Sequence, residues 1–445
     1  MTHEGPDWIA PREGQDWRDD DVLAAVAWLK SFVPEAQMRR RLEAAHARLD
    51  LAVAAWRDGR TADTHDAADT AAWWIVQGES FSDGRRHMVP DDMVRTVPYL
   101  TRIGRELDRL RAIPGAEERA ARLMTGERGA PEPAIYELLV ALAWSRHGWD
   151  TRFVPEVPGG PRTPDLYVSR SRRNWAVECK RVTRSVYARN ERNHGLALAA
   201  PVHRLSEDLG RSFVVRVAYK VELQDVPADY LATRVAEALA PPFVWSDDIA
   251  DGMVRPPTWP LLRRIMAHDD VFYGSSRMIE LLSGAYDHQA DHSFSGRWRP
   301  AEERPMYATT LYHASVVTWT SQSVQARIHK ARHFRQLIAG AERQLPTDRP
   351  GVVHIGVETV GGHATDALRH LRNLMEARAY TPVNPRFRWV YGNYFAPELT
   401  TRRDETWAID ESMSPYKIGR HTTAWPLPDH LLVSPEDEFR PGLHF

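Results

Sequence analysis

Three residues that could carry out chemistry lie in one short stretch near the middle of the chain. The stretch, residues 163–182, reads TPDLYVSRSRRNWAVECKRV and contains Asp165, Glu178 and Lys180. If the chain turns back between Ser171 and Arg172, the two halves pair as an antiparallel hairpin with Asp165 opposite Glu178. Because side chains alternate along a strand, Glu178 and Lys180 then share one face. Two carboxylates and an amine therefore meet at one end of the predicted hairpin.

Neighbouring carboxylates repel each other, so either one of them takes up a proton or a cation neutralises both. Mg²⁺ is usually held by one or two carboxylates, with water and substrate phosphate completing its ligands. A metal held here would polarise a phosphate and lower the pKa of a bound water, which is what phosphodiester hydrolysis needs. The pattern predicts a site for Mg²⁺ or Mn²⁺. The alternative interpretation is an ordinary solvated face, although Glu178-Cys179-Lys180 is the only acidic-x-Lys triplet in the sequence.

A third acidic residue, Glu137, precedes this stretch in the helical segment PAIYELLVALAW. At helical spacing its neighbours are small or apolar, and a carboxylate in such surroundings is costly unless it has a partner. We expect either a metal ion or a nearby basic group to supply that partner.

The elements that would position these residues alternate between helices and strands. The sequence predicts a helix from about 133 to 146, then strands near 151–155, 163–169 and 174–181. A mixed segment over 182–320 follows, with strands predicted near 213–221 and 308–319, and then come a long helix over 321–345 and a buried strand at 351–358. This alternation is typical of an α/β sheet covered by helices. Residues before about 130 read as a helical bundle.

The set Pro164-Asp165, Glu178-x-Lys180 resembles the PD-(D/E)xK nuclease superfamily, which has the restriction-endonuclease-like fold. The resemblance covers about residues 131–181 and implies an αβββαβ core that resumes at 321–360. It implies that Asp165, Glu178 and the backbone carbonyl of Cys179 are metal ligands. Lys180 would orient the attacking water, and Glu137 would be a supporting acid on the helix. Roles in bacterial defence, restriction or repair are what the family implies, with a catalytically silent subunit that binds DNA or protein as the alternative.

The resemblance and the composition together divide the chain into three parts. We expect an N-terminal helical domain over 1–130, a nuclease-like core over 131–395 with an insertion at 182–320, and a C-terminal extension over 396–445. The helical domain could bind a protein partner.

Basic residues are concentrated beside the predicted hairpin. Between residues 170 and 192 they exceed acidic residues by about six, although the whole chain carries a formal charge of −2. Such a segment could follow a phosphate backbone, with DNA favoured over RNA, or it could be a solvated basic loop. The candidate nucleic-acid contacts are Arg170, Arg172, Arg173, Arg181 and Arg184.

The composition limits the other classes of function. The 445 residues include a single cysteine, Cys179, which excludes disulfides within the chain and cysteine-rich zinc sites. No apolar run is long enough to cross a membrane, and the N-terminus lacks the features of a signal peptide. The sequence therefore predicts a cytoplasmic protein with no membrane partner.

Overall fold

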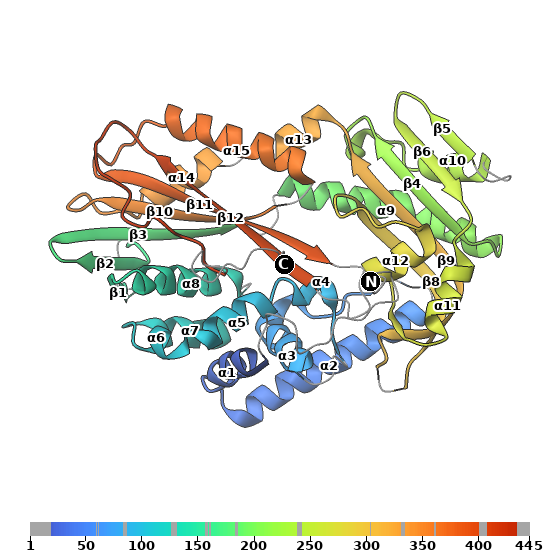
Figure 1. Ribbon diagram of the computed structural model, residues 1–445, viewed down its shortest axis with the longest axis horizontal. Helices are drawn as coiled ribbons and strands as arrows, with labels where there is room; N and C mark the ends of the chain where they lie inside the picture. The colour runs from blue at the N-terminus through green and yellow to red at the C-terminus, as the bar shows by residue number, and fades with distance from the viewer. Residues whose placement is uncertain are drawn as a thin grey trace, which may run out of the picture.

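The structure of the chain is a computed structural model. It describes residues 19–433, apart from 59, 61, 83–86, 126–130, 156–158, 160–161, 183–185, 238–242, 303, 331–333, 360–361 and 400–406. Two sheets lie side by side, and the N-terminal helices run beneath both of them in the view of Figure 1.

The N-terminal region is helical, as the sequence predicts. Its helices are α1 (Asp19–Lys30), α2 (Glu35–Arg57), α3 (Thr70–Ser82), α4 (Pro90–Met93), α5 (Val97–Arg105), α6 (Leu107–Arg111) and α7 (Ala116–Thr125), with a short 3-10 turn at Ala67–Asp69. Their apolar faces join one large core that continues into the first sheet. Among the described residues, no helix is long and apolar enough to cross a membrane.

The first sheet, sheet A, is mixed and has six strands in the order β1-β2-β3-β10-β11-β12. Its elements are α8 (Glu132–Arg146), β1 (Asp150–Phe153), β2 (Leu166–Arg170), β3 (Arg173–Val182), α14 (Phe334–Glu342), β10 (Gly351–Glu358), α15 (Gly362–Ala379), β11 (Phe387–Leu399) and β12 (Trp407–Lys417). Strands β1, β2 and β3 form an antiparallel meander. Strand β10 runs parallel to β3 and β11, and β12 is antiparallel to β11.

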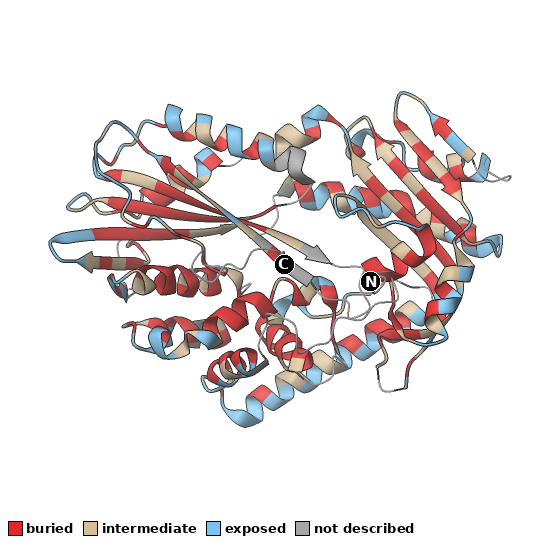
Figure 2. Ribbon diagram, viewed as in Figure 1, coloured by how far each residue is buried: buried red, intermediate tan, exposed pale blue. Residues whose placement is uncertain are grey.

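Helix α8 lies under sheet A and is buried on nearly all sides, between the sheet and the N-terminal helices (Figure 2). Its close approach depends on Gly356 in β10, because a Cβ at that position would come within 2.5 Å of the Tyr136 ring. On the opposite face of the sheet, α14 and α15 cover a separate core that includes Ala176 and Val353. The sheet is therefore covered on both faces, as parallel strands require.

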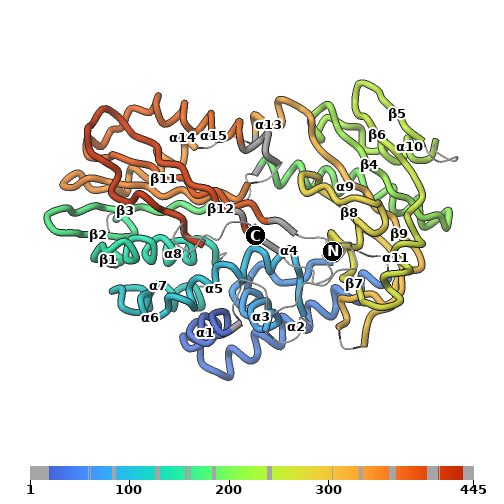
Figure 3. Tube along the Cα trace, viewed as in Figure 1, coloured from blue at the N-terminus to red at the C-terminus, as the bar shows by residue number. Residues whose placement is uncertain are grey.

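The second sheet, sheet B, is formed by the segment that the sequence marks as an insertion. Its path can be followed in Figure 3, where the chain leaves β3, builds sheet B and returns to sheet A. The order is β5-β6-β4-β9-β7, and β8 also pairs with β9. The elements are α9 (Val186–Asp208), β4 (Phe213–Tyr219), a 3-10 turn (Leu223–Asp225), α10 (Tyr230–Glu237), β5 (Phe243–Ser246), β6 (Ala250–Arg255), α11 (Trp259–Met266), β7 (Val271–Phe272), α12 (Ser276–Ser283), β8 (Asp291–Pro300), β9 (Tyr307–Ser321) and α13 (Val324–Lys330).

The α/β class and the N-terminal helices are thus confirmed, whereas two details differ from the sequence prediction. The expected helix over 321–345 begins later, because β9 runs to Ser321, and it is described as α13 and α14, between which 331–333 lie outside the described residues. Pro164 and Asp165 precede β2 rather than opening it. Asp165 therefore lies just before Leu166, the first paired residue of β2, and its side chain accepts a hydrogen bond from the backbone of β3.

Candidate active site

The β2–β3 hairpin has the register that the sequence predicts. Leu166 pairs with Val177 and Arg170 with Arg173, so the turn is formed by Ser171 and Arg172. Ser171 adopts a left-handed backbone conformation, with φ at 55°. Continuing this register by one position places Asp165 at the level of Glu178. Backbone pairing therefore brings the two residues to the same level of the hairpin.

Asp165 is fixed by a hydrogen bond to the neighbouring strand. Its Oδ2 accepts from the backbone N–H of Cys179 at 2.7 Å. The N–H and C=O of one strand residue point to the same side of the strand. The Cys179 carbonyl is therefore directed to the flank of β3 where Asp165 lies. Its thiol is buried in the core on the α8 side, and burial holds the pKa of that thiol well above its usual value.

Glu178 is the most deeply buried acid of the site, with a side chain only 1% exposed. Its Oε1 accepts hydrogen bonds from Lys180 Nζ and from Gln344 Nε2. Its Oε2 is buried and has no hydrogen-bond partner among the described residues. Burial and the nearby Asp165 charge raise the pKa of Glu178 to about 8, although contact with Lys180 acts in the opposite direction. Glu178 thus lies where a proton or another cation is favoured.

Lys180 is half-buried and points to the same face as Glu178. Burial alone would lower the pKa of its amine, but the contact with Glu178 outweighs that effect and raises it. The amine is therefore an ammonium group at neutral pH. It can donate hydrogen bonds and stabilise negative charge, but it cannot act as a base.

Glu137 has the basic partner that its surroundings require. Arg119 of α7 forms an ion pair with its carboxylate, with Nε 2.9 Å from Oε2, and an Arg119 terminal nitrogen lies 3.9 Å from Asp165 Oδ1. The guanidinium is itself buried, with 6% of the side chain exposed, and lies over the Phe153 ring. Arg119 therefore joins the N-terminal helices to the carboxylates of sheet A.

The sequence alone did not reveal Arg119 or Gln344. Arg119 lies in AEERAARLMT, where its spacing from Ala116 and Ala120 marks the buried side of α7, a weak signal for a buried arginine. Gln344 follows the end of α14 and reaches Glu178 only because that helix packs on β3. No local pattern encodes such a contact.

The predicted nucleic-acid contacts are not gathered around the carboxylates. Arg172 and Arg173 are exposed at the tip of the hairpin, and Arg170 beside them donates to the His147 carbonyl at 3.2 Å. Arg173 is five residues from Glu178, about 16 Å along a strand. Arg181 instead donates to the Tyr99 hydroxyl at 3.2 Å and lies over the Phe395 ring. Arg184 lies outside the described residues.

The set of oxygen donors fits a hard divalent cation that keeps several water ligands. Within the part of the chain that the structure describes, no three His, Cys, Asp or Glu side chains gather so that they could hold a metal ion by themselves. The site nevertheless offers the carboxylates of Asp165 and Glu178 and the carbonyl of Cys179, and the buried Oε2 of Glu178 has no hydrogen-bond partner among the described residues. Mg²⁺ or Mn²⁺ binds to such a set when water and phosphate supply the remaining ligands.

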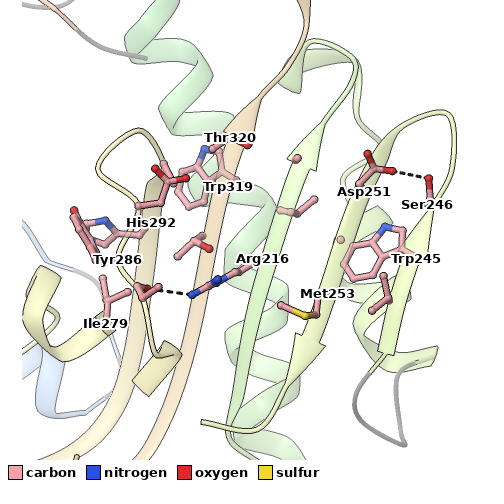
Figure 4. A pocket seen from close by; sticks show the side chains of 18 residues that line it. Arg216, Trp245, Ser246, Asp251, Met253, Ile279, Tyr286, His292, Trp319 and Thr320 are labelled. Atoms are coloured by element: carbon pink, nitrogen blue, oxygen red, sulfur yellow. Dashed lines mark hydrogen bonds between the residues drawn. The ribbon is translucent and has the colours of Figure 1, made fainter. Parts of the chain in front are cut away.

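A separate cavity of about 460 Å³ lies on sheet B (Figure 4). Arg216, Tyr286 and His292 lie around it, and the Arg216 guanidinium is occupied by the carbonyls of Ser283 and Ala285 at 3.0 and 3.1 Å. This cavity belongs to the other sheet and shares none of its lining residues with the Asp165–Glu178 site.

Comparison of the chain with protein-family models, with curated proteins and with solved structures gave no match. The function must therefore be argued from the geometry of the site itself.

Proposed function

We propose that the protein is a metal-dependent nuclease that hydrolyses phosphodiester bonds, with DNA as the favoured substrate. The observation that carries the proposal is the partner-less, buried Oε2 of Glu178 in a site that also holds Asp165 and an ammonium group. A buried carboxylate oxygen with no donor is costly, and a cation would remove that cost.

The order of elements supports the same proposal. Helix α8 precedes the β1–β2–β3 meander, and α14 then leads to β10, which is parallel to β3. This is the succession expected of the αβββαβ core that the sequence resemblance implies. The carboxylates lie on β3 and just before β2, where that resemblance locates them.

Each residue has a definite part in the proposed reaction. Asp165, Glu178 and the Cys179 carbonyl would hold the metal, which would supply electrophilic polarisation of the phosphate and an acidic water ligand. Lys180 stays charged and donates hydrogen bonds to oxygens that gain negative charge. Gln344 fixes the orientation of the Glu178 carboxyl, and Arg119 holds Glu137 in place and balances its charge.

One observation favours a second candidate, a catalytically silent subunit that binds DNA or protein. Lys180 is paired with Glu178, and Arg119 with Glu137 and more distantly with Asp165, so all three carboxylates already have an internal counter-charge. In that case the cluster would serve only to tie α7, α8 and β3 together.

Cleavage assays on supercoiled plasmid, linear duplex, single-stranded DNA and RNA test the proposal. We expect wild-type protein to cleave DNA with Mg²⁺ or Mn²⁺ and to be inactive in EDTA. Asp165→Asn should lose cleavage by two orders of magnitude or more, while Asp50→Asn, at an exposed position of α2, should match wild type. Equal activity of Asp165→Asn and wild type would refute the proposed site, and absence of cleavage on all substrates would favour the silent subunit.

A further inference from the structure

A second cavity of about 810 Å³ lies at the end of sheet A where β11 begins and β12 ends. Four cationic side chains and two tryptophans are among the residues that line it. They are Arg378, Arg388, Lys417, Arg420, Trp389 and Trp425. None of the described lining residues is acidic. We call this cavity the Trp389–Trp425 pocket.

The positive charge of the Trp389–Trp425 pocket is not balanced within the described structure. None of its four cations forms an ion pair with a described carboxylate, and three of them are solvent-exposed. Arg388 is half-buried and donates to the carbonyls of Pro385 at 2.6 Å and Phe387 at 3.1 Å. Burial and the neighbouring Arg386 charge lower the pKa of Arg388. Cations that repel one another in this way favour an anionic ligand.

The two indole rings add a surface for flat rings. Their centroids are 6.0 Å apart with an interplanar angle of 39°. Trp425 is 43% exposed, unusual for so large an apolar side chain, and Trp389 has a buried Nε1–H with no hydrogen-bond partner among the described residues. Exposed aromatic rings interleaved with cations are the arrangement on which unpaired bases stack while their phosphates are neutralised.

We propose that the Trp389–Trp425 pocket binds single-stranded nucleic acid, with one base stacked on Trp425 and flanking phosphates held by Lys417, Arg420 and Arg378. An unpaired base is required because bases within a duplex do not offer their faces to a side chain. This inference rests on the proposed nuclease function and names the form of substrate that the protein engages. In sheet A, β12 is three strand spacings from β3, a distance of about 14 Å. A single nucleic-acid strand is long enough to reach from the Trp389–Trp425 pocket to the carboxylates of β3.

Fluorescence anisotropy with a labelled oligothymidylate in EDTA tests this inference without cleavage. The variants are Trp425→Ala and the double variant Lys417→Gln/Arg420→Gln, with Leu51→Ala and Arg48→Gln on exposed positions of α2 as controls. We expect Trp425→Ala to weaken binding by roughly five- to a hundredfold, as for loss of one stacked base. The double variant should reduce the log–log salt slope by about 1.4, and the controls should match wild type.

Equal affinity of Trp425→Ala and Leu51→Ala, with both variants melting normally, would overturn the inference. So would binding of free thymidine monophosphate as tight as that of the oligonucleotide, or Trp425-dependent binding of duplex as tight as that of single strand. The outcome is separable from the nuclease proposal. Trp425-dependent binding without cleavage of any substrate would support the binding role of the pocket and refute the nuclease proposal. Metal-dependent cleavage by wild type, with equal oligonucleotide binding by Trp425→Ala and wild type, would support the nuclease proposal and refute the binding role of the pocket.

Discussion

The surroundings of the Glu178 carboxyl favour binding of a cation at its buried oxygen. Its carboxyl is almost fully buried, one oxygen is shared by Lys180 and Gln344, and the other has no partner among the described residues. Burial and Asp165 raise its pKa to about 8 from a usual value of 4.5. In metal-free protein, the folded state therefore holds a proton on this carboxyl more tightly than the unfolded state does.

Replacing Glu178 by Gln should change how stability depends on pH. The raised pKa favours the fold fully below pH 4.5, and this contribution is lost as pH rises through about 8. In EDTA, Glu178→Gln should thus melt close to wild type at pH 5 and be more stable at pH 9 by a few kcal/mol, since each pKa unit corresponds to about 1.4 kcal/mol. Melting curves across this range test it, with exposed Glu43→Gln as the control. A constant difference between Glu178→Gln and wild type at all pH values would contradict it.

The pairing of Asp165 with Glu178 was predictable because it depends on a local hairpin. A two-residue turn and strand alternation are enough to place both carboxyls. Arg119 and Gln344 were not predictable, since they reach the site from α7 and from beyond α14 through packing. The sequence predicted that Glu137 needs a metal ion or a basic group as its partner, but only the structure identifies the basic group as Arg119.

At the scale of elements, the β2–β3 hairpin separates two groups of charged side chains along its length. The carboxylates lie at the open end, while Arg170, Arg172 and Arg173 lie at the tip. The tip is on the side of sheet A where β10 and β11 begin, the same side as the Trp389–Trp425 pocket. Basic residues of distant segments are thereby brought to one end of the sheet.

Neutralising the hairpin tip should weaken nucleic-acid binding by an amount that depends on salt. Replacing Arg172 and Arg173 together by Gln removes two exposed cations without touching the carboxylates. We expect the log–log salt slope for duplex DNA to fall by about 0.9 for each lost phosphate contact, with similar losses on unrelated sequences. Arg39→Gln/Arg48→Gln on α2 is the matched double control. An unchanged slope for the tip variant would show that these arginines are merely solvated.

At the scale of the whole molecule, the chain builds a second sheet between β3 and α14. The sequence predicted single strands near 213–221 and 308–319, which correspond to β4 and β9. It could not predict sheet B itself, because β5 and β6 fall in a segment rich in proline and tryptophan, and because β9 pairs in parallel with β4 about a hundred residues earlier. Pairing over such separations leaves no local periodicity.

The C-terminal segment is packed onto sheet A, and one buried histidine makes that packing sensitive to acid. His430 is fully buried, stacks on Tyr391 at 4.3 Å, and burial lowers its pKa to about 3. A depressed histidine pKa favours the fold above pH 6.5, and this contribution is lost as pH falls toward 3. As pH falls from 7.5 to 5, the free energy of unfolding of His430→Phe, measured in urea, should rise by about 2 kcal/mol relative to that of wild type. The control His194→Phe, at an exposed position, should show no such rise. If His430→Phe also showed no rise, burial of a neutral His430 would not be what makes the packing sensitive to acid.

The proposal that the protein is a nuclease is tested most directly by the rate of cleavage in Lys180→Arg. Arg keeps the positive charge, but its planar fork cannot take the compact place of an amine beside a metal-bound water. A matched control exists in Lys30→Arg, because Lys30 also pairs with a glutamate, Glu79, at 2.7 Å. In a single-turnover time course with Mg²⁺, Lys180→Arg should fold and bind DNA but cleave it on the order of a hundredfold more slowly, while Lys30→Arg matches wild type. Full cleavage by Lys180→Arg, or no metal-dependent cleavage of DNA or RNA by wild type, would contradict the proposed function.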